Sequence, residues 1–414
     1  MEQQNMLNGA TGRPWTPAGW AEFPAQQQPD YPGTGVLNDT VAELQRVPGL
    51  VSIAEIHALR QALRLVGEGR AFILQCGDCA ESFSQCRDDV LRNWTETMQT
   101  MADNIGHGLG LPVVKIGRIA GQYAKPRSSP EETRNGITLP SYRGDIINGH
   151  AFSSDARIPS PERMLNAYYH AAVTLNALRG SGTFPAAETA QDALFQPYYI
   201  SHEALLLPYE TALTRRNPAD NRWYNCGAHT VWLGDRTNDP SQAHAEYLRG
   251  IENPVGIKCG PSMTPEKLGA LLIRLNPGNQ PGRIMLIVRM GADNICEKLP
   301  PLIAKAAADN DAVIWLSDPM HGNTRSTADN LKTRDFSVVY REAGLFVQLL
   351  RAAGMHPGGL HLEMTGQPVT ECTGGPQKIT DQDVGACYES LCDPRLNAAQ
   401  ATELVRLLSG SAGR

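Results

Sequence analysis

The sequence lacks long hydrophobic runs and stretches of charge of one sign. No segment approaches the roughly 18 apolar residues of a membrane-spanning helix. The N-terminus has no basic stretch followed by an apolar one. The 37 basic and 43 acidic residues are interspersed and give a net charge of -6. Because such a chain has no concentrated positive surface, we expect neither nucleic acid nor a membrane as a partner. These absences predict a soluble, cytoplasmic protein.

Four common catalytic signatures are also missing. The sequence contains no G-x-x-x-x-G-K-S/T phosphate loop, no G-x-G-x-x-G after an expected strand, no H-E-x-x-H and no G-x-S-x-G. Their absence argues against nucleotide-driven chemistry, nicotinamide-dependent redox chemistry and serine hydrolysis.

The nine cysteines are odd in number and thinly spread, so we expect reduced thiols and no disulfide framework. Cys76 and Cys79 form a C-x-x-C pair, but no second pair exists to complete a four-thiolate zinc site. One hypothesis for this pair is a reversible Cys76–Cys79 disulfide that blocks metal binding.

Strand-like and helix-like segments alternate along most of the chain. The apolar or β-branched runs span residues 71–75, 112–116, 197–201, 229–233, 254–259, 284–289, 312–317 and 359–363. Such alternation indicates a parallel sheet, and eight units predict an α/β fold, a single (β/α)8 TIM barrel. A doubly wound open sheet is the alternative. We expect residues 51–414 to form the barrel and residues 1–50, which are rich in Gln and Pro, to form an extended arm.

Three of the expected helices have recognisable N-terminal signals. Ser52 and Glu55 form a capping box before a helix that Gly67 ends. Ser160-Pro161-Glu162 and Thr264-Pro265-Glu266 each place a hydroxyl residue and a proline where a helix begins.

The residues that follow the expected strands are polar or ionisable. In a (β/α)8 barrel these positions meet at one face, where the chemistry takes place. The basic residues at or near them are Arg118, Lys125, Arg127, Arg236, Lys258 and Arg289. So many charge-assisted donors predict a cavity for more than one phosphate or carboxylate. Ser128 adds a hydroxyl group within a proline-stiffened loop.

Four residues with metal-binding side chains also follow expected strands or lie in loops. They are Cys79, His321, Glu363 and Asp393. A thiolate, an imidazole and two carboxylates suit Mn, Fe, Co or Zn and leave a coordination position for substrate or water. We therefore hypothesise one divalent metal site.

Several long motifs resemble those of the type II 3-deoxy-D-arabino-heptulosonate 7-phosphate (DAHP) synthases. They are QCGDCAESF (75–83), KIGRIAGQYAKPRSSP (115–130), YRGDIINGH (142–150), SHEALLLPYE (201–210), NPVGIKCGPSMTPE (253–266), IWLSDPMHGNT (314–324), HPGGLHLEMTGQPVTECTGG (356–375) and LCDPRLN (391–397). The resemblance implies a (β/α)8 barrel that condenses phosphoenolpyruvate with D-erythrose 4-phosphate and water and releases phosphate. This reaction is the entrance to the shikimate pathway.

The resemblance also implies roles for individual residues. The metal ligands would be Cys79, His321, Glu363 and Asp393, with manganese as the preferred ion. The phosphoenolpyruvate clamp would be Arg118, Arg236, Lys258 and Arg289, with Ser128 nearby, and the erythrose 4-phosphate side would be Lys125 and Arg127. The catalytic residues would be Lys258, Arg236, Asp235 and Lys125. Likeness to the family implies a homodimer or a larger homo-oligomer.

The chain departs from the family in two places. Residues 234–236 read Gly-Asp-Arg where the family commonly shows Gly-Glu-Arg, so the carboxylate of Asp235 is one methylene shorter. The connection from about 180 to 197 is short, which resembles a compact subgroup tied to secondary metabolism such as phenazine-type pathways. It predicts weak or no inhibition by aromatic amino acids. The alternatives are a synthase for an aminated sugar phosphate and a non-catalytic regulatory barrel.

Overall fold

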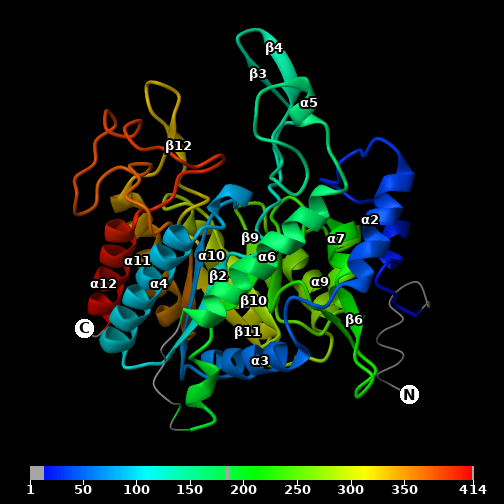
Figure 1. The fold of residues 1–414 in the computed structure, drawn as a ribbon. Helices are drawn as coiled ribbons and strands as arrows, with labels where there is room; N and C mark the ends of the chain where they lie inside the picture. The colour runs from blue at the N-terminus through cyan, green and yellow to red at the C-terminus, as the bar shows by residue number, and fades with distance from the viewer. Residues whose placement is uncertain (1–13, 182–186, 188, 413–414) are drawn as a thin grey trace.

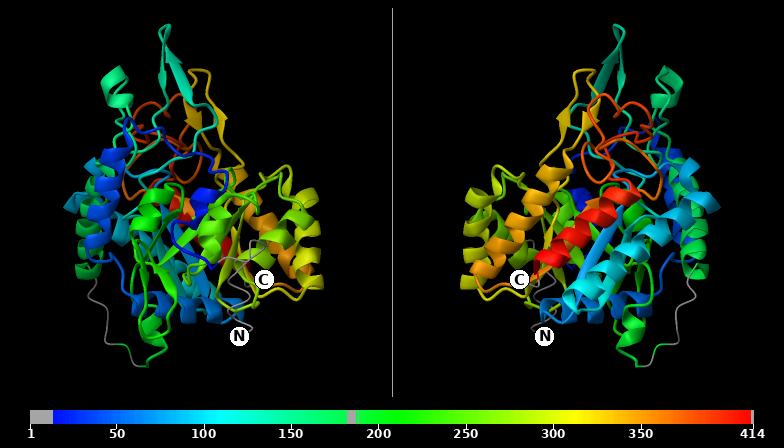
Figure 2. Two further views of the ribbon diagram at one scale, coloured as in Figure 1. Left: turned by 90° about the vertical axis from the view of Figure 1, so that its right-hand side faces the viewer. Right: turned by 90° about the vertical axis from the view of Figure 1, so that its left-hand side faces the viewer.

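The computed structural model describes residues 14–181, 187 and 189–412. Figure 1 shows a barrel of strands surrounded by helices, with a hairpin and long loops projecting beyond one end of the barrel. Figure 2 shows the same projection from two sides.

Eight parallel strands close the barrel. They are β1 (Phe72–Gly77), β2 (Val113–Arg118), β5 (Tyr199–Glu203), β8 (Thr230–Leu233), β9 (Val255–Cys259), β10 (Ile284–Val288), β11 (Val313–Ser317) and β14 (Pro357–Glu363). Their order around the barrel follows their order in the chain, and β14 pairs with β1 to complete the ring. All eight predicted strands are confirmed to within two residues at either end. The closed ring rules out the doubly wound open sheet.

One main helix follows each strand and contributes to the outer layer. These helices are α4 (Asp88–Leu109), α6 (Arg163–Gly180), α7 (Leu207–Ala212), α8 (Ala243–Arg249), α9 (Pro265–Leu275), α10 (Ile295–Ala308), α11 (Phe336–Ala352) and α12 (Ala398–Ala412). Their apolar faces and the outer faces of the strands form the larger of two buried hydrophobic clusters. This layer holds the strands in the ring that carries the functional side chains.

Helix α3 (Ile53–Gly67) packs across one end of the barrel. The predicted capping box is confirmed, because the Ser52 amide donates to Glu55 Oε2 at 2.7 Å and the Glu55 amide donates to Ser52 Oγ at 3.2 Å. Leu59, Leu63 and Val66 form one buried cluster with inward-facing strand residues. In Figure 1 this helix lies at the end of the barrel opposite the projecting loops. The open end is therefore the one where the strands finish.

The two other predicted helix starts differ from each other. Thr264 caps α9 as expected, and its side chain accepts a hydrogen bond from the Lys267 amide. Helix α6 instead begins at Arg163 without a side-chain cap. The Ser160 amide donates to the Ile147 carbonyl, so residues 160–162 form a turn that packs on the preceding loop.

The N-terminal segment is only partly extended. Residues 34–46 form helix α2 (Thr34–Arg46), which corrects the expectation of an extended arm over that stretch. Leu37, Val41 and Leu44 recur at helical spacing and pack against the core, and this burial outweighs the weak local signals. Before α2 lies a 3-10 helix, η2 (Gly19–Glu22), and the indole of Trp15 donates to the Glu246 carbonyl at 2.9 Å. The part of the predicted arm in residues 1–13 falls outside the described residues.

Several short elements project from the open end. They are the hairpin β3 (Glu131–Arg134) and β4 (Ile137–Pro140), the short helix α5 (Ser154–Arg157), and the pair β12 (Arg325–Ser326) and β13 (Lys332–Thr333). A further hairpin, β6 (Thr214–Arg216) and β7 (Trp223–Asn225), follows α7. Gly144 allows the segment after β4 to cross the one after β2, since a Cβ there would lie 1.9 Å from the Tyr123 carbonyl oxygen.

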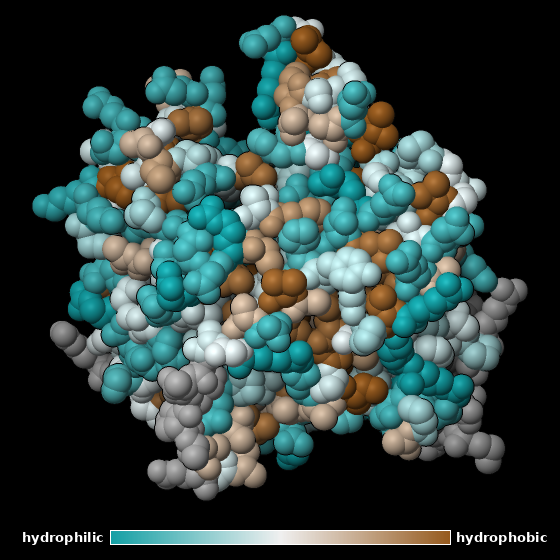
Figure 3. All heavy atoms as spheres, in the orientation of Figure 1, coloured by the Kyte–Doolittle hydropathy of each residue, from teal (hydrophilic) through white to brown (hydrophobic). Residues whose placement is uncertain are grey.

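Within the described part of the chain, no helix has both the length and the hydropathy needed to cross a membrane. Figure 3 shows hydrophilic and hydrophobic residues interspersed over the face that carries α4 and α6.

The short connection from 180 to 197 contains a 3-10 helix, η4 (Asp192–Leu194). Residues 182–186 and 188 of this connection lie outside the described part.

Candidate active site

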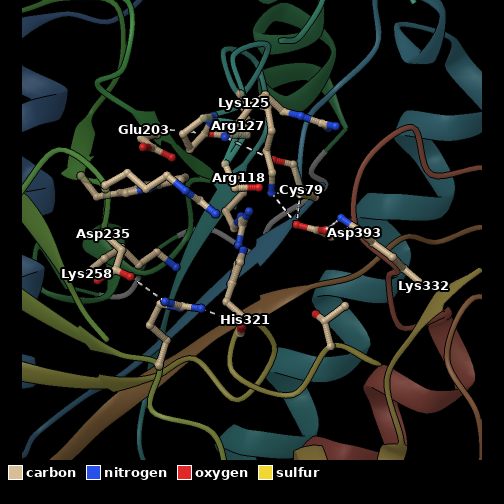
Figure 4. A pocket seen from close by; sticks show the side chains of 18 of the residues that line it. Cys79, Arg118, Lys125, Arg127, Glu203, Asp235, Lys258, His321, Lys332 and Asp393 are labelled. Carbon is tan, nitrogen blue, oxygen red and sulfur yellow. Dashed lines mark hydrogen bonds and ion pairs between the residues drawn. The ribbon is translucent and has the colours of Figure 1, made fainter. Parts of the chain in front are cut away.

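The predicted site residues meet at one cavity at the open end of the barrel (Figure 4). Its volume is about 250 Å³. The predicted residues on its wall are Cys79, Arg118, Lys125, Arg127, Ser128, Asp235, Arg236, Lys258, Arg289, His321 and Asp393. Glu363 is fully buried behind this wall and contacts Arg118 and His321. The barrel thus gathers every residue that the sequence suggested for the site.

Positive charge dominates the cavity. Eight basic side chains and three carboxylates line it. Lys332 and Arg334, which come from the segment around β13, are two basic residues that the sequence analysis did not single out. An excess of fixed positive charge in a concave, partly buried site favours small molecules with more than one anionic group.

The four candidate metal ligands converge. One ligand atom from each of Cys79, His321, Glu363 and Asp393 lies within 4.8 Å of all the others. Cys79 follows β1, His321 follows β11, Glu363 ends β14, and Asp393 precedes α12. The closed ring places the ends of β1, β14 and β11 side by side, so residues far apart in sequence become neighbours.

The imidazole of His321 is oriented for metal binding. Its Nδ1 lies 2.8 Å from Asp318 Oδ2, so Nδ1 carries the hydrogen and Nε2 is left with its lone pair. Nε2 in turn faces Glu363 Oε1 at 2.8 Å. Two acceptor atoms at this distance repel each other unless a proton or a cation lies between them. The donor set therefore fits a divalent cation.

Cys79 and Asp393 form the other half of the cluster. Cys79 Sγ lies 3.3 Å from Asp393 Oδ2, and the ammonium of Lys125 contacts both side chains, at 2.6 Å from Asp393 Oδ2. Burial and the neighbouring Cys392 and Glu363 raise the pKa of Cys79 well above its usual value. A bound cation would displace this proton, and Cys79 would then serve as a thiolate ligand.

A buried ion-pair network supports the loop of Asp393. Glu371 accepts hydrogen bonds from the amides of Ser390 at 2.8 Å and Arg395 at 2.7 Å. The Arg395 guanidinium donates to Glu371 and, at 2.6 Å, to Asp78 Oδ1. Because Asp78 precedes Cys79, this arginine joins the two loops that carry one half of the cluster.

Arg118 and Lys258 share a buried acceptor. Both side chains approach His361 Nε2 at 2.8 Å. Since arginine and lysine only donate, Nε2 accepts, and His361 Nδ1 donates to Gln75 Oε1 at 2.8 Å. The two cations are thereby fixed beside each other at the cavity. Burial and the charge of Arg118 lower the pKa of Lys258 to about 8, although Asp318 opposes this shift.

Residues 234–236 occupy the opposite part of the wall. Arg289 donates to Asp235 Oδ2 at 2.7 Å and to the His321 carbonyl at 2.6 Å. Although its side chain is one methylene shorter than that of glutamate, Asp235 therefore holds Arg289, a predicted phosphoenolpyruvate-binding residue, in place. Arg236 is exposed, and among the described residues it has no ion-pair partner.

The loop from Lys125 to Ser128 forms the rim of the cavity. The carboxylate of Glu81 accepts hydrogen bonds from the amides of Ala120, Gly121 and Gln122 at 2.7 to 2.9 Å, which fixes the chain between Arg118 and this loop. The Lys125 amide donates to the Arg143 carbonyl at 2.9 Å. Ser128 is exposed and reaches the wall.

Glu203 is a wall residue to which the sequence analysis assigned no role. It ends β5, it is 8% exposed, and its Oε1 has no hydrogen-bond partner among the described residues. Gly234 leaves room for this carboxylate, since a Cβ at 234 would lie 1.9 Å from Glu203 Oε1. Its position at the end of a strand was the available signal, because an acidic residue there faces the cavity.

Comparison with known proteins identifies one family. Residues 15–196 and 186–409 match the class-II DAHP synthetase family. The chain is 43% identical over 430 residues to phospho-2-dehydro-3-deoxyheptonate aldolase of Streptomyces coelicolor, with 94% of this chain and 96% of the relative covered. It is 39% identical over 466 residues to the protein of the same name from Neurospora crassa, with 99% of this chain and 96% of that protein covered.

The fold also agrees with a solved structure. Phospho-2-dehydro-3-deoxyheptonate aldolase from Francisella tularensis SCHU S4 superposes with a TM-score of 0.51 at 14% identity, over 90% of this chain and 96% of that chain. The resemblance inferred from the motifs is confirmed: the chain belongs to the class-II DAHP synthetase family.

Proposed function

We propose that this enzyme condenses phosphoenolpyruvate with D-erythrose 4-phosphate and water to give 3-deoxy-D-arabino-heptulosonate 7-phosphate and phosphate. The observation that carries this proposal is the combination of eight basic side chains around one cavity with four converging metal-binding side chains. Phosphoenolpyruvate has two anionic groups and the sugar phosphate has one. The excess of positive charge suits both substrates together.

Phosphoenolpyruvate would be bound by Arg118, Lys258, Arg289 and Arg236. Arg118 and Lys258 are already held side by side by His361, so the enzyme does not have to order them when the substrate binds. Exposed Arg236 adds a positive charge that forms no ion pair among the described residues. Preorganised donors of this kind fix the orientation of an anion, which is a major part of the rate enhancement in two-substrate reactions.

D-Erythrose 4-phosphate would be bound on the other side, with its phosphate at Arg127 and Ser128. Its aldehyde would then lie near Lys125, next to the candidate metal ligands. Burial opposes the charge of Lys125, but Asp393 and Cys79 outweigh it and hold its pKa well above the usual value. Lys125 therefore keeps its proton and is placed to donate a hydrogen bond to the aldehyde oxygen as negative charge develops.

Cys79, His321, Glu363 and Asp393 would hold one divalent cation, and we infer manganese for this mixed sulfur, nitrogen and oxygen set. When bound, such a cation supplies Lewis-acid activation of a carbonyl oxygen. The His321 side chain is kept in the ligating tautomer by Asp318.

In the reaction, C3 of phosphoenolpyruvate forms a bond to the aldehyde carbon, water adds at C2, and phosphate leaves. The buried carboxyl group of Glu203, with its unpartnered Oε1, would hold that water. Burial raises the pKa of Glu203, although Lys125 and Lys258 oppose the shift. A carboxyl group with a raised pKa is suited to accept and return a proton.

The test is phosphate release from the purified chain with phosphoenolpyruvate and D-erythrose 4-phosphate in the presence of manganese. The proposal expects release only when both substrates are present. Competition with an aminated tetrose phosphate distinguishes the alternative sugar substrate. Absence of release with either sugar would leave the non-catalytic barrel as the explanation and contradict the proposal.

We also infer that the chain forms a homodimer or larger assembly through α2 and α6. Tyr169 and Val173 of α6 are 52% and 59% exposed, and Val36 of the neighbouring α2 is 45% exposed. Exposed apolar groups on adjacent helices favour association. Light scattering on the purified enzyme and on the Val173→Glu variant tests this, with a smaller mass expected for the variant.

A cytoplasmic location and a role in secondary metabolism complete the proposal. All nine cysteines are free, as expected in a reducing compartment. Among these thiols, the Cys76–Cys79 switch remains a hypothesis. The short connection between residues 180 and 197 supports the secondary-metabolism assignment.

A further inference from the structure

The Gln-rich stretch that precedes α2 makes specific contacts at the mouth of the barrel. It comprises Gln26, Gln27 and Gln28, in a segment whose composition predicted only an extended arm. Figure 2 shows the N-terminal segment, in blue, running along the outside of the barrel toward the base of the projecting loops. The Ala243 amide donates to the Pro24 carbonyl at 3.1 Å and anchors the segment just before this stretch.

The side-chain amide of Gln27 pairs with the backbone of Arg127. Gln27 Oε1 accepts from the Arg127 amide at 3.0 Å, and Gln27 Nε2 donates to the Arg127 carbonyl at 3.2 Å. The primary amide thus satisfies both backbone polar groups of one residue, as a neighbouring strand would. Arg127 lies in the rim loop that extends from Lys125 to Ser128.

Gln27 is itself held in place. Its φ angle is 59°, a left-handed conformation that costs energy for a residue other than glycine and persists only where the surroundings stabilise it. The Arg143 guanidinium supplies that support, since it donates to the Gln27 carbonyl at 2.5 Å and to the Gln28 carbonyl at 3.2 Å. The carbonyl of Arg143 also accepts the Lys125 amide at 2.9 Å.

Gln28 repeats the pattern on a second loop. Its Nε2 donates to the Leu205 carbonyl at 2.8 Å, and its Oε1 accepts from the Leu207 amide at 3.2 Å. Leu205 lies two residues beyond Glu203, at the end of β5. Consecutive glutamines therefore tie the N-terminal segment to two loops that carry residues of the cavity wall.

We infer that Gln27 is a positioning residue that fixes the rim loop for binding of the sugar phosphate. This inference rests on the proposed function, because Arg127 acts there on the phosphate of D-erythrose 4-phosphate. The guanidinium of Arg127 is anchored only loosely from its own side, at 3.8 Å from Glu132. Its backbone position therefore depends on Gln27. Without the amide pair, the rim loop would have to be ordered when the sugar phosphate binds, which raises the entropic cost of binding.

The first experiment compares Gln27→Met, which keeps the length of the side chain but removes both hydrogen bonds, with Gln26→Met as the matched control. Gln26 is exposed, and no hydrogen bond of its side chain is found among the described residues. For Gln27→Met we expect the KM for D-erythrose 4-phosphate to rise roughly tenfold, equivalent to about 1.4 kcal/mol. The KM for phosphoenolpyruvate and the melting temperature stay as in the parent enzyme.

The second experiment does not depend on activity. Hydrogen exchange of the peptide that contains the Arg127 amide is measured on the parent enzyme and on both variants. If Gln27 holds the rim loop, this amide should exchange faster in Gln27→Met and at the parent rate in Gln26→Met. A double-mutant cycle with Arg143→Met should give less than the sum of the two single effects, because both side chains support the same contact.

The outcomes separate the two proposals. Faster exchange of the Arg127 amide in Gln27→Met, together with an inactive parent enzyme, would support the positioning role of Gln27 and contradict the proposed reaction. Unchanged exchange, or an equal rise of both KM values in Gln27→Met, would contradict the positioning role of Gln27 and leave the proposed reaction standing.

Discussion

Arg118 donates a buried hydrogen bond to Glu363 across 3.1 Å, and this pair joins the two halves of the candidate site. Arg118 belongs to the proposed anion clamp, whereas Glu363 belongs to the proposed metal cluster. Burial opposes the negative charge of Glu363, but its contacts with His321 and with the guanidinium groups of Arg334 and Arg118 outweigh burial and hold its pKa well below its usual value. The carboxylate is therefore ionised and ready to bind a cation.

Replacement of Lys258 should abolish most activity without unfolding the protein. In Lys258→Ala we expect kcat/KM for phosphoenolpyruvate to fall by roughly 100-fold or more, because a charged donor at the reacting anion is lost. The partner Asp318 keeps its hydrogen bond to His321, so circular dichroism should remain native. Lys298→Ala, at a partly exposed position where the lysine pairs with Glu297, is the control. Near-parental turnover in Lys258→Ala would remove this lysine from the site.

The pKa of Lys258 predicts an alkaline limit to activity. Below about pH 8 the side chain is protonated and attracts phosphoenolpyruvate, and above it the charge is lost. The value of kcat/KM for phosphoenolpyruvate should therefore fall as the pH rises through 8. Lys258→Arg, whose guanidinium stays charged, should lack this limb even if its overall rate is lower. An identical alkaline limb in both enzymes would assign it to another group.

A methyl group at position 234 should impair the reaction through Glu203. Because the added Cβ would lie 1.9 Å from Glu203 Oε1, Gly234→Ala has to displace the carboxyl group. We expect kcat to fall by roughly 10-fold or more, with Glu203→Gln giving a similar loss. Gly344→Ala serves as control, since nothing lies within 4 Å of its Cβ. Full activity in Glu203→Gln would show that this carboxyl group takes no part.

The barrel and the metal-binding cluster were predictable from sequence for the same reason. Each strand carries a short apolar run, and the residue after it faces the open end, so Cys79, His321 and Glu363 could be grouped without knowing their distances. Asp393 follows no strand, and it was singled out as a loop carboxylate and by the motif LCDPRLN. Its position depends on Glu371 and Arg395, which no local pattern connects.

Other features were beyond local sequence signals because long-range packing decides them. Helix α2 lies in a polar segment and forms because Leu44 is buried where α2 packs on the outer helices α6 and α7. Lys332 reaches Asp393 from β13, at 2.8 Å, through a hairpin without strand-like composition. The pairing of Gln27 with Arg127 spans 100 residues. A Gln-rich composition indicates disorder unless the chain meets a partner of this kind.

The short connection predicts an enzyme without strong feedback control. We expect little change in initial rate when Phe, Tyr or Trp is added singly or together at micromolar concentrations. The rate of phosphate release at substrate concentrations near KM is the measurement. A clear inhibition curve for any of the three amino acids would contradict the assignment to the compact subgroup.

The most direct test of the central claim is the metal content and activity of the same preparation. Treatment with a chelator should remove one divalent ion per chain and abolish phosphate release, and added manganese should restore both. Cys79→Ser and Asp393→Asn should bind the ion weakly, while Cys296→Ser, at an exposed position, should behave as the parent. Full activity in the metal-free enzyme, or unchanged metal binding in both ligand variants, would contradict the account.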